Sequence, residues 1–135
     1  MRKKILFVCV ENAGRSQMAE AFAKRYGGED VEVYSAGTMP ASSIHPEVIE
    51  VMKERGLDLS SKKPQMLDLK MVEAADIVVT MGCSVEELCP APLIKNFVNW
   101  NIEDPKGKPI EKVREIRDEV ERRVLELLQQ IKRGS

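Results

Sequence analysis

The chain has 135 residues, 43% of them apolar, which is enough for one compact core, so we expect a single domain over residues 1–135. Its 21 basic and 22 acidic residues almost cancel. The composition therefore argues against nucleic acid or an anionic membrane as a partner. No apolar run approaches the roughly 18 residues of a membrane span, and the apolar run near the N-terminus is too short for a signal peptide, so we expect a cytoplasmic protein.

The apolar run over residues 4–9 has no alternation, which is typical of a strand buried on both faces of a parallel sheet. Further candidate strands are segments 31–34, 76–80 and 97–100. Apolar residues at helical spacing predict helices over 14–26, 46–55 and 109–132. The last of these is expected to cover one face of the sheet, although a coiled-coil or partner-binding face is an alternative.

Strands that alternate with helices predict an α/β fold with a parallel sheet. Ligands of such sheets bind beyond the carboxyl ends of the strands. The residues at these predicted ends are Cys9, Ser35, Met81 and Asn101. We therefore expect the functional site at this edge.

Cys9 ends the first predicted strand, and Arg15 stands at the start of the helix that follows. Backbone N–H groups in such a turn form an anion nest, the helix N-terminus adds positive potential, and a guanidinium matches two oxygens of an oxyanion. The predicted oxyanion-binding residues are Val10, Glu11, Asn12, Ala13, Gly14 and Arg15. The loop thus predicts a site for a tetrahedral oxyanion such as phosphate or arsenate.

Most free cysteines are small buried apolar residues, but the position of Cys9 favours a catalytic nucleophile. The positive field of the loop favours the thiolate, and Ser16 could donate a hydrogen bond to the sulfur. The lysine of a nucleotide-binding loop is missing after Gly14. ATP chemistry is therefore not expected.

A family resemblance rests on several motifs together. They are Cys9-x5-Arg15-Ser16-Gln-Met-Ala-Glu20, Ser35-Ala-Gly37, Thr80-Met-Gly-Cys83, Cys89-Pro and Asp104-Pro105. Over nearly its whole length the chain resembles the thioredoxin-coupled arsenate reductases, which are related to the low-molecular-weight protein tyrosine phosphatases. This resemblance implies a three-layer sandwich with a four-stranded parallel sheet flanked by helices.

The resemblance also implies a reaction. Cys9 would attack arsenic, Asp104 would assist the loss of water, Cys83 would release arsenite, and Cys89 would close a disulfide with Cys83. Thioredoxin or a similar dithiol donor would then reduce the enzyme, and no cofactor or metal is expected. Cys83 stands one residue later than its counterpart in better-known relatives, so an order in which Cys89 attacks Cys9 first stays open.

Two alternatives remain. One is a phosphatase that hydrolyses phosphate monoesters through a Cys9 phosphoenzyme, and the other is a non-catalytic oxyanion or redox sensor. Cys83 and Cys89 favour reduction, because hydrolysis needs only one thiolate. Lys106 stands where the phosphatases usually carry an aromatic residue, and this also favours a small inorganic substrate.

Glu11 is an unusual residue for an oxyanion loop, and we expect its side chain to point outward. The set Asn12, Glu20, Ser35 and Asp68 resembles the potassium site of some arsenate reductases. His45, the only histidine, is expected to begin a helix rather than to act as a base. We expect no structural zinc site, and a monomer.

Overall fold

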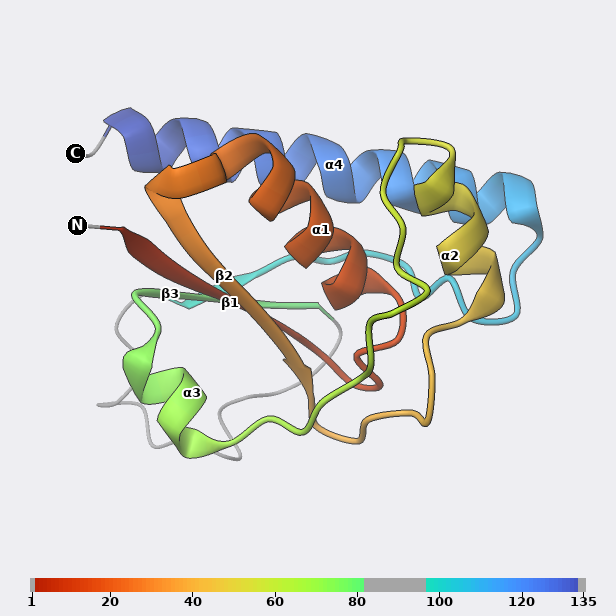
Figure 1. Cartoon of the computed structure of the whole chain (residues 1–135), viewed down its shortest axis with the longest axis horizontal. Coiled ribbons are helices and arrows are strands. Elements are labelled where there is room, and N and C mark those ends of the chain that lie inside the picture. The colour runs from red at the N-terminus through yellow and green to blue at the C-terminus, as the bar shows by residue number, and fades with distance from the viewer. Residues whose placement is uncertain (1, 82–96, 134–135) are drawn as a thin grey trace.

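The computed structural model describes residues 2–81 and 97–133 and has an α/β fold (Figure 1). Four parallel strands form one sheet in the order β2-β1-β3-β4. The strands are β1 (Lys3–Cys9), β2 (Val31–Gly37), β3 (Ile77–Thr80) and β4 (Phe97–Asn99). The helices are α1 (Arg15–Gly27), the short 3-10 helix η1 (Gly28–Asp30), α2 (Pro46–Lys53), α3 (Leu69–Ala74) and α4 (Ile110–Arg133). The parallel sheet and its flanking helices confirm the predicted fold class.

The central strand β1 is buried on both faces, as its unbroken apolar run predicts. Ile5 and Phe7 face the larger core, which α1, α2 and α4 complete, whereas Leu6 and Val8 face a smaller core under α3. Figure 1 shows these helices on opposite sides of the sheet. Burial of a side chain such as Phe7 stabilises the folded state by roughly 1.5–3 kcal/mol. Because β1 buries side chains on both faces, it is held firmly in the centre of the sheet.

The apolar stripe of α4 is buried in the larger core. Val113, Val120 and Val124 have no exposed surface, and α4 packs against α1 and α2 (Figure 1). The prediction that this helix covers the sheet is therefore confirmed. Its apolar face is used within the chain rather than presented to a partner.

The helix α3 was not predicted from the sequence. It has six residues, of which only Val72 is buried, and the Asp68 side chain begins it by accepting a hydrogen bond from the Met71 N–H. A pattern that depends on one buried residue is too weak to separate a helix from a loop. The strand β2 is also longer than predicted, because Ser35 to Gly37 pair with the end of β1.

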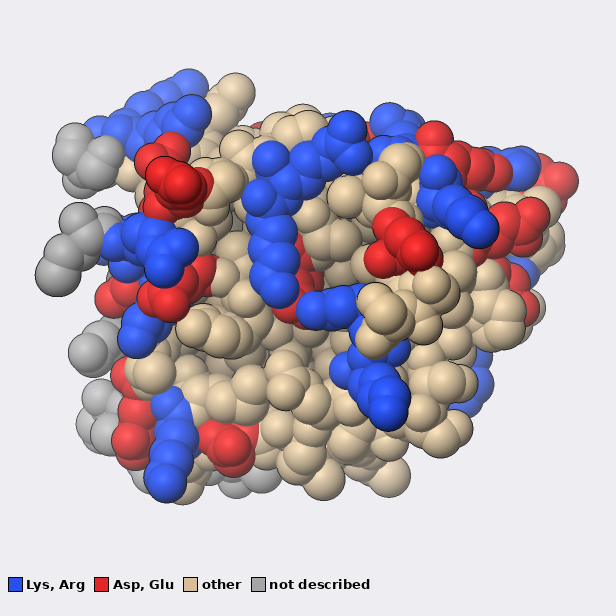
Figure 2. Space-filling view, viewed as in Figure 1, with Lys and Arg blue, Asp and Glu red and all other residues tan. Residues whose placement is uncertain are grey.

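Basic and acidic side chains are both present over much of the face in Figure 2, in keeping with the nearly balanced charge. Many charged side chains of the described residues form ion pairs, such as Arg114 with Glu54 at 2.9 Å and Arg55 with Asp118 at 2.7 Å. In the part of the chain that the structure describes, no helix is long and apolar enough to cross a membrane.

Candidate active site

The loop between β1 and α1 is held from outside through its carbonyl oxygens. The segment 38–45 supplies the donors: Thr38 to Cys9, Met39 to Val10, Ala41 to Glu11 and His45 to Ala13, over 2.8–3.2 Å. Among the described residues, no acceptor binds the backbone N–H groups of Glu11, Ala13, Gly14 or Arg15. The loop therefore has the donor groups of the predicted anion nest available for an oxyanion.

Asn12 fixes the shape of this loop from its centre. It has a φ of 53°, a left-handed conformation that asparagine tolerates better than most residues. Its buried side chain donates to the Ser16 hydroxyl (2.7 Å) and accepts from Gln17 (3.1 Å) and from the Gln65 N–H (3.0 Å). All the polar groups of this amide are thus engaged except one N–H, so the loop is tied to both α1 and the segment before α3.

Gly37, at the end of β2, allows a close approach to the same loop. A Cβ atom at this position would lie 2.6 Å from the Val10 carbonyl oxygen and 2.9 Å from the Asn12 nitrogen. Both neighbours are backbone atoms, which cannot move aside as a flexible side chain would. The Ser35-Ala-Gly37 motif therefore serves the loop through packing as well as through strand pairing.

The thiol of Cys9 lies at the base of the loop and is only 3% exposed. Its Sγ lies 2.8 Å from the Ser16 Oγ and accepts a hydrogen bond from the Asn12 N–H at 3.2 Å. Because Asn12 already donates to the Ser16 oxygen, the hydroxyl hydrogen of Ser16 is free to point to the sulfur. The sulfur thus has two hydrogen-bond partners inside the loop.

Arg15 and Asp104 meet at the wall of the site, although they come from opposite ends of the sequence. The Arg15 guanidinium is buried and donates to the Ile102 carbonyl (3.0 Å), while its other terminal nitrogen lies 3.7 Å from the Asp104 carboxylate. Asp104 also accepts from the Lys106 N–H at 3.0 Å, which closes a turn around Pro105. The sheet thus brings the predicted acid to the predicted oxyanion loop.

A cavity of about 160 Å³ joins these groups. It is lined by Cys9, Val10, Glu11, Gly14, Arg15, His45 and Asp104. Pockets for drug-sized ligands measure roughly 300–1,000 Å³, so this cavity suits a small inorganic anion better than a large organic one.

Two lining residues make contacts that were not expected. Glu11 is one of them, and its carboxylate lies 3.1 Å from the Lys106 ammonium. His45 precedes α2 as expected, but it also lines the cavity, with its Nε2 3.7 Å from Glu11. Nothing in the spacing of the sequence indicates these two contacts. Cys83 and Cys89 lie outside the described residues.

The potassium ion stays a prediction, and the structure shows how Glu20, one member of its expected set, is engaged. The Glu20 carboxylate accepts from Ser35 (2.5 Å) and binds two ammonium groups, Lys24 at 2.7 Å and Lys62 at 3.2 Å. These two lysines already offset the charge of Glu20. No group of three or more His, Cys, Asp or Glu side chains that could hold a metal ion is present among residues 2–81 and 97–133.

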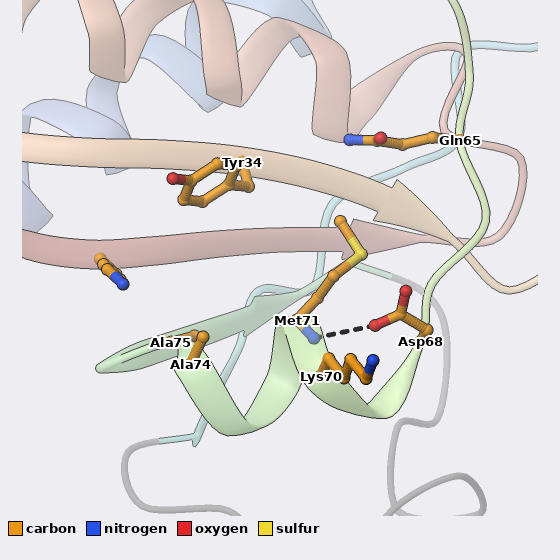
Figure 3. A pocket seen from close by; sticks show the side chains of 8 residues that line it. Tyr34, Gln65, Asp68, Lys70, Met71, Ala74 and Ala75 are labelled. Carbon is orange, nitrogen blue, oxygen red and sulfur yellow. Dashed lines mark hydrogen bonds between the residues drawn. The ribbon is translucent and has the colours of Figure 1, made fainter.

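Asp68, the fourth member of that set, is engaged elsewhere. It lines a second cavity of about 320 Å³ beside α3, with Tyr34, Gln65, Met71 and others (Figure 3). The dashed line in Figure 3 is its hydrogen bond to the Met71 N–H, 2.9 Å long. Of the predicted catalytic residues that the structure describes, Cys9, Arg15, Ser16 and Asp104, none lines this cavity.

A cysteine at a strand end, a loop of backbone donors and an arginine at a helix start define a cysteine-dependent enzyme that acts on a tetrahedral oxyanion. The family model for low molecular weight phosphotyrosine protein phosphatases matches residues 4–135. The chain belongs to this family.

Comparison with individual proteins places arsenate reductases among its relatives. A putative arsenate reductase from Halobacterium salinarum is 46% identical over 129 residues, which cover 92% of this chain and 89% of that protein. The structure of a thioredoxin-dependent arsenate reductase from Corynebacterium glutamicum is similar with a TM-score of 0.85 and 40% identity. That match covers 99% of this chain, and this chain spans only 64% of the length of that one.

The structure of a phosphatase matches this fold with a comparable TM-score, at a lower sequence identity. An arginine phosphatase from Geobacillus stearothermophilus gives a TM-score of 0.88 with 31% identity, over 98% of this chain and 94% of that one. The fold is therefore shared by reductases and phosphatases, and the chemistry has to be argued from the site.

Proposed function

We propose that this protein reduces arsenate to arsenite, with Cys9 as the nucleophile and with Cys83 and Cys89 as a thiol-disulfide relay that thioredoxin or a similar dithiol donor regenerates. The observation that carries the proposal is the placement of the Cys9 sulfur, held by Ser16 and the Asn12 N–H, at a cavity of about 160 Å³ that Arg15 and Asp104 also line. The identity to proteins named arsenate reductases supports it.

In the first step the Cys9 thiolate forms a sulfur–arsenic bond. The backbone N–H groups of the loop and the Arg15 guanidinium stabilise the negative charge of the arsenate oxygens. Asp104 donates a proton to one oxygen, which leaves as water. Arsenic is still pentavalent in the resulting adduct, so no electrons have yet been transferred.

Reduction takes place in the second step. The Cys83 thiolate attacks the Cys9 sulfur, a disulfide forms between the two residues, and the electron pair of the broken sulfur–arsenic bond stays on arsenic, which leaves as arsenite. Cys89 then attacks Cys83, which restores the Cys9 thiolate and leaves a Cys83–Cys89 disulfide. A dithiol donor reduces this disulfide and becomes oxidised. If Cys89 attacks Cys9 first and Cys83 then attacks Cys89, the atoms and electrons balance in the same way.

A phosphatase is the second candidate, because a phosphatase structure is as similar as a reductase structure. The same loop would hold a phosphate monoester, and water would hydrolyse the phosphoenzyme. The lining favours the smaller substrate, since Glu11 lines the cavity and pairs with Lys106, and none of the described lining residues is a phenylalanine, tyrosine or tryptophan against which a phenyl group could stack. Phosphate esters are therefore expected to be poorer substrates than arsenate.

The test compares two reactions of the same protein. Arsenite formation is measured with arsenate, thioredoxin, thioredoxin reductase and NADPH, and ester hydrolysis is measured with p-nitrophenyl phosphate. We expect sustained arsenite formation that Cys9→Ser abolishes. Efficient Cys9-dependent ester hydrolysis without arsenite formation would make the protein a phosphatase and overturn the proposal. Modification of Cys9 without turnover of either substrate would instead identify a sensor.

A further inference from the structure

Glu11, an unusual residue for an oxyanion loop, forms an ion pair with Lys106, which stands where the phosphatases usually carry an aromatic residue. The Lys106 Nζ lies 3.1 Å from one Glu11 carboxylate oxygen and 3.2 Å from the other. Glu11 belongs to the oxyanion loop, and Lys106 belongs to the loop that carries Asp104, which we name the acid loop and define as residues 102–107. The pair therefore links the two loops at the rim of the cavity.

Other contacts show that the acid loop rests directly on the oxyanion loop. A Cβ atom built on Gly14 would lie 3.1 Å from the Pro105 ring, so a larger residue there would push Pro105 back by a few tenths of an ångström. The Arg15 guanidinium also holds the Ile102 carbonyl at 3.0 Å. Asp104 lies between Ile102 and Pro105 in the chain, so its position depends on how the acid loop is held.

We propose that the Glu11–Lys106 pair is a latch that positions Asp104 over the cavity while Asp104 acts as an acid. The Arg15–Asp104 ion pair cannot serve this purpose, because Asp104 must be protonated to donate, and a neutral carboxyl group loses its ionic attraction to Arg15. The latch does not involve the charge of Asp104. It therefore holds the acid loop closed in the protonation state that the reaction needs.

The latch also explains how a carboxylate is tolerated beside an anion-binding site. Lys106 neutralises Glu11, and His45 lies 3.7 Å from the same carboxylate. Without Lys106 the negative charge of Glu11 would repel arsenate, whereas without Glu11 the positive charge of Lys106 would attract it. The two single substitutions should therefore change the KM for arsenate in opposite directions, although both should slow the step that needs Asp104.

This inference rests on the proposed role of Asp104, and its test is the rate of arsenite release in a single turnover at saturating arsenate without thioredoxin. Exposed ion pairs contribute roughly 0.2–1 kcal/mol, equivalent to a factor of about 1.5 to 5 in the ratio of latched to unlatched molecules. We expect Glu11→Gln and Lys106→Met each to lower the rate, by at most this factor. The charge-swapped variant Glu11→Lys/Lys106→Glu should recover most of the rate.

Two comparisons separate the latch from a general effect of charge. Lys53→Met removes an exposed positive charge at the end of α2, outside the acid loop and the cavity lining, and it should leave the rate unchanged. In an Asp104→Asn background, Lys106→Met should cause no further loss, because the acid that the latch positions is already absent. An equal loss in both backgrounds, or a charge swap slower than either single variant, would overturn the latch.

Failure of the proposed function would be distinguishable from failure of the latch. If the unaltered protein releases no arsenite, the reductase proposal is wrong, and the same variants are compared by hydrolysis of phosphate esters with poor leaving groups. The latch then predicts the same pattern of losses, since such leaving groups also need the proton of Asp104. If the variants lose ester hydrolysis in a different pattern, this would contradict the latch.

Discussion

The Sγ atom of Cys9 and the Oγ atom of Ser16 lie 2.8 Å apart in the buried base of the oxyanion loop. Ser16 accepts from the Asn12 amide, and its own hydrogen is free to point to the sulfur. The hydroxyl thus couples the nucleophile to the residue that shapes the loop.

Replacing this serine should make Cys9 less reactive. A hydrogen bond to a charged group contributes about 1.5–3 kcal/mol, so Ser16→Ala should slow the alkylation of Cys9 by iodoacetamide at pH 7 roughly tenfold or more. Arsenite formation should fall similarly. The control is Ser43→Ala, an exposed serine outside the site. Equal alkylation rates in the Ser16 variant and the unaltered protein would mean that this hydrogen bond does not activate the sulfur.

Asp104→Asn should slow the step in which oxygen leaves as water. General acid catalysis contributes typically 10²–10⁴-fold, so we expect arsenite formation to fall at least about 100-fold. Phosphate binding should not weaken, because the substitution removes a negative charge near Arg15. Glu103→Gln is the matched control, since Glu103 is the adjacent acid but pairs with Lys108 and Lys112. Similar losses in both variants would argue against a specific role for Asp104.

Gly37→Ala should distort the oxyanion loop. The added methyl group would meet two backbone atoms of that loop at 2.6 and 2.9 Å, and overpacking of this kind typically costs about 1–3 kcal/mol. Thermal unfolding measures the stability loss, and arsenite formation well below the melting temperature measures the distortion. Gly27→Ala overpacks Val31 and Leu128 away from the site, so it should lose stability and keep activity. Full activity in the Gly37 variant would contradict the packing argument.

Glu54 should make stability depend on pH. Hydrogen bonds from Arg114 and Arg117 lower the pKa of this carboxyl group below its ordinary value of 4.5. A lowered pKa in the folded state means that the stabilisation is present above about pH 4.5 and is lost as the pH falls through the folded-state value. Urea unfolding should therefore show that Glu54→Gln destabilises the protein at pH 7 and much less at pH 3. A loss of unfolding free energy of the same size at both pH values would contradict this linkage. The control is Glu73→Gln, on the exposed surface of α3.

The sequence predicted those features that depend on local pattern. The double-faced apolar run of β1, the glycine-terminated helix α1 and the stripe of α4 were all found close to their expected bounds. The oxyanion loop was predictable as well, because a cysteine at a strand end and an arginine at a helix start lie within one short segment. Asp104 was found at the cavity, where the family resemblance had placed it.

The features that the sequence did not predict depend on contacts between distant segments. Asn12 is held by Gln65, and Glu11 is paired with Lys106, although nothing in the spacing of these residues relates them. The expectation for Glu11 came from its charge alone, and the sequence does not indicate the lysine that pairs with it. In the same way, the ion pairs of Glu20 with Lys24 and Lys62 could not be read from the sequence motif that contains Glu20.

The most direct test of the thiol relay is the number of turnovers that Cys89→Ser completes. NADPH consumption is followed with arsenate, thioredoxin and thioredoxin reductase for this variant and for the unaltered protein at equal concentration. The relay predicts steady consumption by the unaltered protein and at most one arsenite per molecule of Cys89→Ser. Many turnovers by the variant at the rate of the unaltered protein would show that Cys89 is not part of the reaction and would contradict the relay.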